Sequence, residues 1–286
     1  MQELKGINMS DTFKIAVAQM DPHIGDLPHN RARILDMLRE AAAEGAKLIV
    51  FPECALSGYV FDSAAAALSS TETVPGETTS LLAKLCAALD VYCVFGLLER
   101  AGNDIFNSAV VIGPQGIVQN YRKCHLPVLG IDRFAAKGDS IPVIDLPFAR
   151  IGLLICYDLR FPEASRSLAL RGIDLLIIPT NWPEGAESSP DFLTRARSWE
   201  NRLFVAACNR VGEERGTRFI GRSQIIGADA KFMAEADGAS EVILYAEIDP
   251  ALAREKRVVI RPGEFEFDPI GARRPELYGG LDTPTA

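Results

Sequence analysis

The feature that most constrains the fold is an order of strands and helices that occurs twice along the chain. Short apolar runs predict strands, longer stretches with helical periodicity predict helices, and glycine and proline mark the turns between them. In the first half we expect strand 13–20, helix 29–45, strand 47–51, helix 77–90, strand 91–98 and a hairpin of 105–112 with 117–123. In the second half we expect strand 150–156, helix 162–171, strand 173–179, helix 191–201, strand 203–209 and a hairpin within 223–234.

This repetition predicts an α/β protein with two similar halves rather than two independent domains. Apolar strands are buried when sheets lie inside and helices outside. Residues 242–249 are expected to complete a sheet, and a short helix is expected from Pro250. Residues 57–73 are expected to form a surface excursion, and those beyond Arg257, rich in proline, glycine and charge, an irregular tail.

Composition and charge narrow the class of protein. The chain has 286 residues, of which 48% are hydrophobic and 24% charged, as in soluble globular proteins. A formal charge of −8 argues against a nucleic-acid partner and against an anionic membrane surface. No apolar run is long enough to span a membrane, and the polar N-terminus does not resemble a signal sequence. We therefore expect a cytoplasmic protein with a disordered leader (1–12), one domain (13–270) and a C-terminal tail (271–286).

The six cysteines are scattered and form no C-x-x-C pair, so reduced thiols are expected and a zinc site is not. Cys156 stands out because it ends an apolar run just before a helix that Pro162 can start. Helix-terminus N–H groups near such a thiol can lower its pKa and hold a developing oxyanion. The alternative is a small buried hydrophobic residue, and this stretch alone leaves both interpretations open.

Two further strand ends carry charge. Glu53 follows the apolar run 48–51, where burial would raise the pKa of its carboxyl group and suit it to act as a base. Lys123 ends the strand 117–123, where its ammonium could pair with that carboxylate. Strand alternation predicts that the neighbouring Cys54 and Cys124 face away. A surface ion pair and a solvated lysine are the ordinary alternatives, and a histidine base would depend on His125.

Three segments in this order resemble the signatures of the nitrilase, or carbon–nitrogen hydrolase, superfamily. They are Phe-Pro-Glu at 51–53, Tyr-Arg-Lys-Cys-His-Leu-Pro at 121–127 and Cys-Tyr-Asp-Leu-Arg-Phe-Pro-Glu at 156–163. Shorter pieces support the resemblance, which runs from about residue 13 to 270: Val-Ala-Gln at 17–19, Tyr59, Asn107-Ser108, Pro-Thr-Asn-Trp at 179–182, residues 196–201 and Gly-Arg-Ser at 221–223.

The resemblance implies a four-layer α-β-β-α sandwich that assembles as a homodimer or larger homo-oligomer. It implies that Cys156 is the nucleophile, Glu53 the general base and Lys123 the group that stabilises the oxyanion, together with the backbone N–H of Tyr157. The implied substrate is a small amide, cleaved through a thioester without a metal or other cofactor. Many members carry a second glutamate after the lysine. Here Asp132 is the nearest carboxylate, and it either replaces that glutamate or pairs with Arg133 at the surface.

The residues after Cys156 most resemble amidase-type members, including the ω-amidase-like group. They lack the Cys-Trp-Glu of true nitrilases, and Leu159 replaces an arginine that D-amino-acid carbamoylases use for a substrate carboxylate. Arg160 is expected to form a structural ion pair. Asn181 and Trp182 are expected beside the pocket, with Trp182 as a wall or as core. N-carbamoyl hydrolysis, nitrile hydrolysis, an inactive interaction module and a cysteine redox sensor remain as alternatives.

Overall fold

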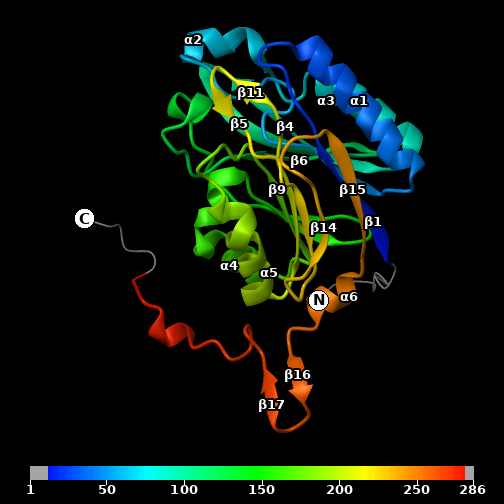
Figure 1. Ribbon diagram of the computed structural model, residues 1–286, viewed down its shortest axis with the longest axis vertical. Coiled ribbons are helices and arrows are strands. Elements are labelled where there is room, and N and C mark those ends of the chain that lie inside the picture. Colours follow the sequence, from blue (N-terminus) through cyan, green and yellow to red (C-terminus); the bar gives the residue numbers. More distant parts are fainter. Residues whose placement is uncertain (1–11, 281–286) are drawn as a thin grey trace, which may run out of the picture.

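The computed structural model describes residues 12–280 and places two mixed β-sheets face to face, with helices outside them (Figure 1). The first sheet has the spatial order β15-β1-β2-β4-β5-β6, with β3 beside β4. Its strands are β1 Phe13–Gln19, β2 Leu48–Val50, β3 Thr71–Glu72, β4 Tyr92–Ala101, β5 Asp104–Gly113, β6 Gly116–Arg122 and β15 Val242–Ile248.

The second sheet has the order β14-β13-β10-β9-β8-β7. Its strands are β7 Val143–Asp145, β8 Arg150–Leu153, β9 Leu175–Pro179, β10 Phe204–Cys208, β13 Gln224–Ile226 and β14 Phe232–Glu235. In each sheet three neighbouring strands are parallel: β1, β2 and β4 in the first, β8, β9 and β10 in the second. An antiparallel strand lies on one side of each trio and an antiparallel hairpin on the other. The two similar halves predicted from the sequence are therefore confirmed.

Helices cover the outer face of each sheet (Figure 1). They are α1 Leu27–Ala43 and α3 Glu77–Leu89 on the first sheet, and α4 Pro162–Leu170 and α5 Thr194–Asn201 on the second. The Asp26 side chain caps α1 by accepting from the His29 N–H, and Pro162 occupies the first turn of α4. Shorter elements are α2 Ala64–Ala67, α6 Pro250–Arg254 and a small β11 Glu213–Glu214 and β12 Thr217–Arg218 pair.

Two apolar layers hold this arrangement together. Between the sheets, alternate side chains of β1, β2 and β4 pack with β8, β9 and β10 in one continuous buried cluster. The opposite faces of β1, β2 and β4 pack under α1 and α3 in a second cluster. Because strands are buried on both faces, their side chains are apolar throughout, which is why the sequence shows continuous rather than alternating runs.

Several expectations were wrong in detail. Strand β8 ends at Leu153, so Cys156 lies in a 3₁₀ turn, Cys156–Arg160, and not at a strand end. Residues 57–59 are buried rather than exposed, because their chain packs between the two halves. The segment beyond Arg257 contains a hairpin, β16 Val258–Arg261 and β17 Phe265–Phe267, that extends from the body (Figure 1). The expected leader, except for Thr12, lies outside the described residues.

The remaining short helices complete the described chain. A π-helical turn, Ser189–Leu193, precedes α5. The expected helix 191–201 therefore changes from π-helical to α-helical hydrogen bonding at Thr194. Single 3₁₀ turns occur at Leu68–Ser70, Gly130–Arg133 and Pro275–Leu277. None of the helices in residues 12–280 is both long and apolar enough to cross a membrane.

Candidate active site

Glu53 lies in a tight turn that follows β2 at the carboxyl end of the parallel strands. Its side chain is almost fully buried, with 1% of its surface exposed. The turn rests on the backbone of β4, where the Gly96 N–H donates to Pro52 O (3.1 Å) and the Leu56 N–H donates to Gly96 O (3.2 Å). A Cβ added at Gly96 would lie 2.4 Å from Cys54 N and 2.7 Å from Glu53 Cα. Only glycine lets the strand approach this turn so closely.

We expect Gly96→Ala to reduce turnover strongly, because the new methyl group must displace the turn that carries Glu53. A misplacement of about 1 Å at a reacting group can cost on the order of 10²-fold in rate. The measurement is kcat/KM together with the melting temperature. Gly279→Ala, at a position with no neighbouring atom within 4 Å, is the control and should leave both unchanged. Equal kcat/KM in the two variants would contradict this prediction.

Lys123 follows β6 and reaches the same edge of the first sheet, where its ammonium lies between two carboxylates. Its Nζ is 2.6 Å from Glu53 Oε1 and 2.6 Å from Asp132 Oδ2, and all three side chains are buried. Burial alone would lower the pKa of Lys123, but the charges of Asp132 and Glu53 raise it well above its ordinary value. The lysine is therefore a fixed cation in the site and not a solvated surface charge.

Asp132 accepts hydrogen bonds from groups that sequence reasoning had given no role. The Asn107 amide donates to Asp132 Oδ1 (2.9 Å) and to Glu53 Oε1 (2.6 Å), so it bridges the two acids. The Tyr59 hydroxyl donates to Asp132 Oδ2 at 2.7 Å. Arg133 donates instead to backbone oxygens, so the alternative of a surface pair with Asp132 is wrong. The shorter acid is held here by Tyr59 and Asn107 in contact with the lysine.

The Glu53 carboxyl group has the properties of a base. Burial raises its pKa above the ordinary value, the Lys123 ammonium opposes this, and the Asp132 charge adds to it. Oε1 is occupied by Lys123 and Asn107, whereas the buried Oε2 has no hydrogen-bond partner. A buried carboxylate oxygen without a partner costs free energy, so its presence calls for an explanation such as a catalytic role. Here Oε2 is free to accept a proton.

Cys156 comes from the second sheet. It begins the 3₁₀ turn after β8 in a left-handed conformation (φ +45°), and 9% of its surface is exposed. Burial and the nearby Glu53 charge raise the pKa of its thiol to about 12, whereas Lys123, the Thr180 hydroxyl and the Asn181 backbone N–H act in the opposite direction. The resting sulfur is therefore protonated at neutral pH, and its reaction needs a base. Thr180 is a site residue that the sequence did not single out.

A cavity of about 250 Å³ opens over Cys156. It is lined by Pro127, Leu129, Cys156, Tyr157, Arg160, Trp182, Pro183, Glu184, Gly185, Ala186 and Ser189. Trp182 is both a cavity wall and a member of the core between the sheets, so its two proposed roles coexist. The Asn181 side chain does not line the cavity, but both of its polar atoms are buried without a partner.

Arg160 departs from expectation. Among residues 12–280 no carboxylate lies within 4.0 Å of its guanidinium, so the structural ion pair that we expected is absent from the described chain. The exposed side chain lines the cavity over Cys156 instead. Its 3₁₀ turn is held through the backbone, where Arg197 donates to the carbonyl oxygens of Leu159 and Arg160. The cavity lining therefore carries the Arg160 guanidinium, which has no ion-pair partner in the described chain, and the Glu184 carboxylate, which lies 3.7 Å from Arg218.

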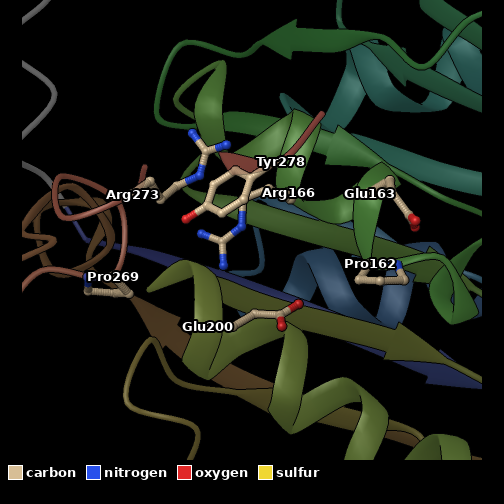
Figure 2. A pocket seen from close by; sticks show the side chains of 7 residues that line it. All are labelled: Pro162, Glu163, Arg166, Glu200, Pro269, Arg273 and Tyr278. Carbon is tan, nitrogen blue, oxygen red and sulfur yellow. The ribbon is translucent and has the colours of Figure 1, made fainter. Parts of the chain in front are cut away.

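A larger cavity of about 390 Å³ lies between α4, α5 and the C-terminal segment (Figure 2). It is lined by Pro162, Glu163, Arg166, Glu200, Pro269, Arg273 and Tyr278. None of Glu53, Lys123 and Cys156 lines it, so size alone does not identify the reactive site. Within residues 12–280 there is also no group of three histidine, cysteine or acidic side chains arranged to hold a metal ion.

The fold and the buried glutamate, lysine and cysteine define a class of protein that comparison with known proteins identifies. Residues 14–258 match the model of the carbon–nitrogen hydrolase family, and the chain belongs to this family. A nitrilase from Pyrococcus abyssi is 37% identical over 249 residues, covering 86% of this chain and 93% of that protein. The human omega-amidase is 31% identical over 255 residues, covering 83% and 89%.

Solved structures agree with this assignment. A mutant of the amidase from Nesterenkonia sp. AN1 superposes with a TM-score of 0.76 at 25% identity, covering 93% of this chain and 95% of that one. In that structure the acetamide moiety of fluoroacetamide is covalently added at the active-site cysteine. The resemblance inferred from the three sequence segments and the nitrilase-like fold are both confirmed.

Proposed function

We propose that this protein is an amidase that cleaves the C–N bond of a small amide through a thioester on Cys156. One observation supports it most directly: a buried ammonium, Lys123, is fixed between two acids beside a thiol that lines a cavity. A neutral thiol, a buried base and a fixed cation are the three parts that nucleophilic attack on an amide requires.

In the acylation step, Glu53 takes the proton of the Cys156 thiol while the sulfur attacks the amide carbon. The carbonyl oxygen becomes an oxyanion beside the Lys123 ammonium, with the backbone N–H of Tyr157 as the second donor. The intermediate collapses to a thioester, and the leaving nitrogen takes the proton from Glu53. Ammonia or an amine departs, and Glu53 is again a carboxylate.

In the deacylation step, water donates a proton to Glu53 and adds to the thioester carbon through a second oxyanion. Collapse of this intermediate breaks the C–S bond, and the Glu53 proton returns to the sulfur. The carboxylic acid leaves and the thiol is restored. Lys123 keeps its proton throughout, because the two acids hold its pKa high. Each oxyanion donor is worth roughly 3–4 kcal/mol of transition-state stabilisation.

The cavity supports a more specific substrate, a primary amide with a carboxylate at its other end. Arg160 lines the cavity without an acid partner, so a substrate carboxylate would be its counter-charge. The names of the omega-amidase relatives agree with this class. The same positive charge makes an N-carbamoyl amino acid the second candidate, because that substrate also carries a carboxylate.

Four substrates test the proposal: a neutral aliphatic amide, the same amide with a terminal carboxylate, the matching nitrile and an N-carbamoyl amino acid. We expect the carboxylated amide to have the highest kcat/KM. Arg160→Gln should reduce the kcat/KM of the carboxylated amide about ten-fold, which is the effect expected from the loss of a partly solvated, charge-assisted hydrogen bond. The kcat/KM of the neutral amide should not change. The fastest ammonia release from the carbamoyl compound would replace the first candidate with the second. If no substrate releases ammonia, the proposed function is wrong.

A further inference from the structure

Asp158 is a fully buried carboxylate two residues after Cys156. Its Oδ1 accepts from the backbone N–H of His125 (2.9 Å) and lies 2.7 Å from the Nδ1 of the same residue. Its Oδ2 accepts from the Tyr121 hydroxyl (2.7 Å) and from the backbone N–H of Ile155 (2.9 Å). Four partners at these distances hold the carboxylate in one orientation.

The partners of Asp158 belong to both halves of the molecule. Tyr121 and His125 stand two residues before and two residues after Lys123, so the carboxylate holds both flanks of the lysine. Ile155 directly precedes Cys156. The His125 ring also stacks on Phe161 of the second half, with ring centroids 3.8 Å apart and planes 15° from parallel. One side chain thus ties the segment that carries the ammonium to the turn that carries the thiol.

We infer that Asp158 is a positioning residue that sets the place of the Cys156 sulfur relative to the Lys123 ammonium, an inference that rests on the proposed function. The Cys156 backbone is in the left-handed region, which is unfavourable for a residue with a side chain and persists only where its surroundings impose it. Asp158 supplies this constraint because its Oδ2 accepts from the Ile155 N–H and its own N–H donates to Ile155 O (3.0 Å), so that both bonds span Cys156.

The contacts also assign His125. Its Nδ1 is directed at Asp158, and its ring packs on Phe161, so it serves the same link between the two segments. The Tyr121 hydroxyl remains a donor because burial, and next the Asp158 charge, raise its pKa. The histidine that a cysteine–histidine enzyme would need as a base is therefore used to support the turn.

The first test is Asp158→Asn, which places an amide NH₂ where the carboxylate accepted hydrogen bonds. We expect kcat for a neutral amide to fall by about 10- to 100-fold, as for a small displacement of reacting groups, with KM changed less than about three-fold. The rate at which iodoacetamide alkylates Cys156 should fall as well. Tyr121→Phe removes one partner and should give a smaller loss that is not additive with Asp158→Asn.

Asp174→Asn is the matched control. Asp174 is also a buried carboxylate, accepting from the Arg150 backbone N–H (2.8 Å) and from Arg254, but it lies before β9, at the opposite end of the strands from the site. It should lower the melting temperature and leave kcat and the alkylation rate unchanged. If Asp158→Asn behaves like this control, the positioning role is overturned.

Two outcomes keep the inference separate from folding and from the proposed function. If Asp158→Asn does not fold, Tyr121→Phe decides, and an unchanged kcat and alkylation rate in that variant overturn the role. Alkylation of Cys156 does not require amide turnover. A wild-type protein that hydrolyses no amide would overturn the proposed function, whereas slower alkylation in Asp158→Asn would still support the positioning of the thiol.

Discussion

Cys156→Ala is expected to abolish ammonia release from every amide substrate while the protein stays folded. Removal of a catalytic nucleophile costs on the order of 10⁴-fold or more, because only binding and oxyanion stabilisation remain. The lost sulfur lines the cavity over the site, so its removal leaves the sheets intact. Single-turnover ammonia release measures the loss of activity, and a thermal melt shows whether the protein stays folded.

The matched control is Cys124→Ala. The Cys124 thiol is more exposed than that of Cys156, and it donates to the backbone oxygens of Arg122 (3.7 Å) and Ser140 (3.6 Å). Activity should persist in this variant. In the wild type, iodoacetamide should label Cys156 before Cys124, because Glu53 can take the proton from the Cys156 sulfur. Preferential labelling of Cys124, or full activity without Cys156, would contradict the assignment.

Glu53→Gln is expected to stop both half-reactions, because one base serves acylation and deacylation. General base catalysis contributes typically 10²- to 10⁴-fold, and the glutamine cannot take a proton from sulfur or water. A single-turnover experiment should show no burst of ammonia. Glu72→Gln is the control. The Glu72 carboxylate, in β3, pairs with Arg31 of the outer helix α1, and its loss should leave turnover unchanged. A rapid burst in Glu53→Gln would exclude this base for attack.

The pH dependence follows from the same carboxyl group. Glu53 must be ionised to accept a proton, and burial raises its pKa above that of an ordinary glutamate. The wild-type kcat/KM should therefore be constant at neutral pH and fall as the pH drops through this raised value. The acid limb should lie at higher pH than for an unperturbed glutamate, and the residual activity of Glu53→Gln should lack it.

Much of the architecture could be predicted because apolar runs and their punctuation are local signals. The two halves, their helices and the strands that precede Glu53 and Lys123 all follow from such runs. The burial of Glu53 was also expected, since a residue directly after an apolar strand stays close to the core. The local sequence was sufficient to predict these features.

The features that were missed depend on contacts between distant segments. Tyr59 and Asn107 meet Asp132 through turns and a strand whose register the sequence does not show. Strand alternation also failed at Cys54, which lies in a turn (φ +49°) and donates to Asn107 Oδ1 at 3.6 Å, close to the site. The hairpin beyond Arg257 was missed because its strands, four and three residues long, are too short to show a periodic pattern.

The internal repeat of the fold is not repeated in its chemistry. The strand pattern makes β1, β2 and β6 counterparts of β8, β9 and β14. Glu53 follows β2 by three residues, Lys123 follows β6 directly and Cys156 follows β8 by three residues. The positions related to them by pseudosymmetry carry no ionisable side chain: Trp182, Ala236 and Pro22. A duplicated scaffold thus carries one unduplicated set of reactive groups, and titration with an acylating reagent should saturate at a single thioester per chain.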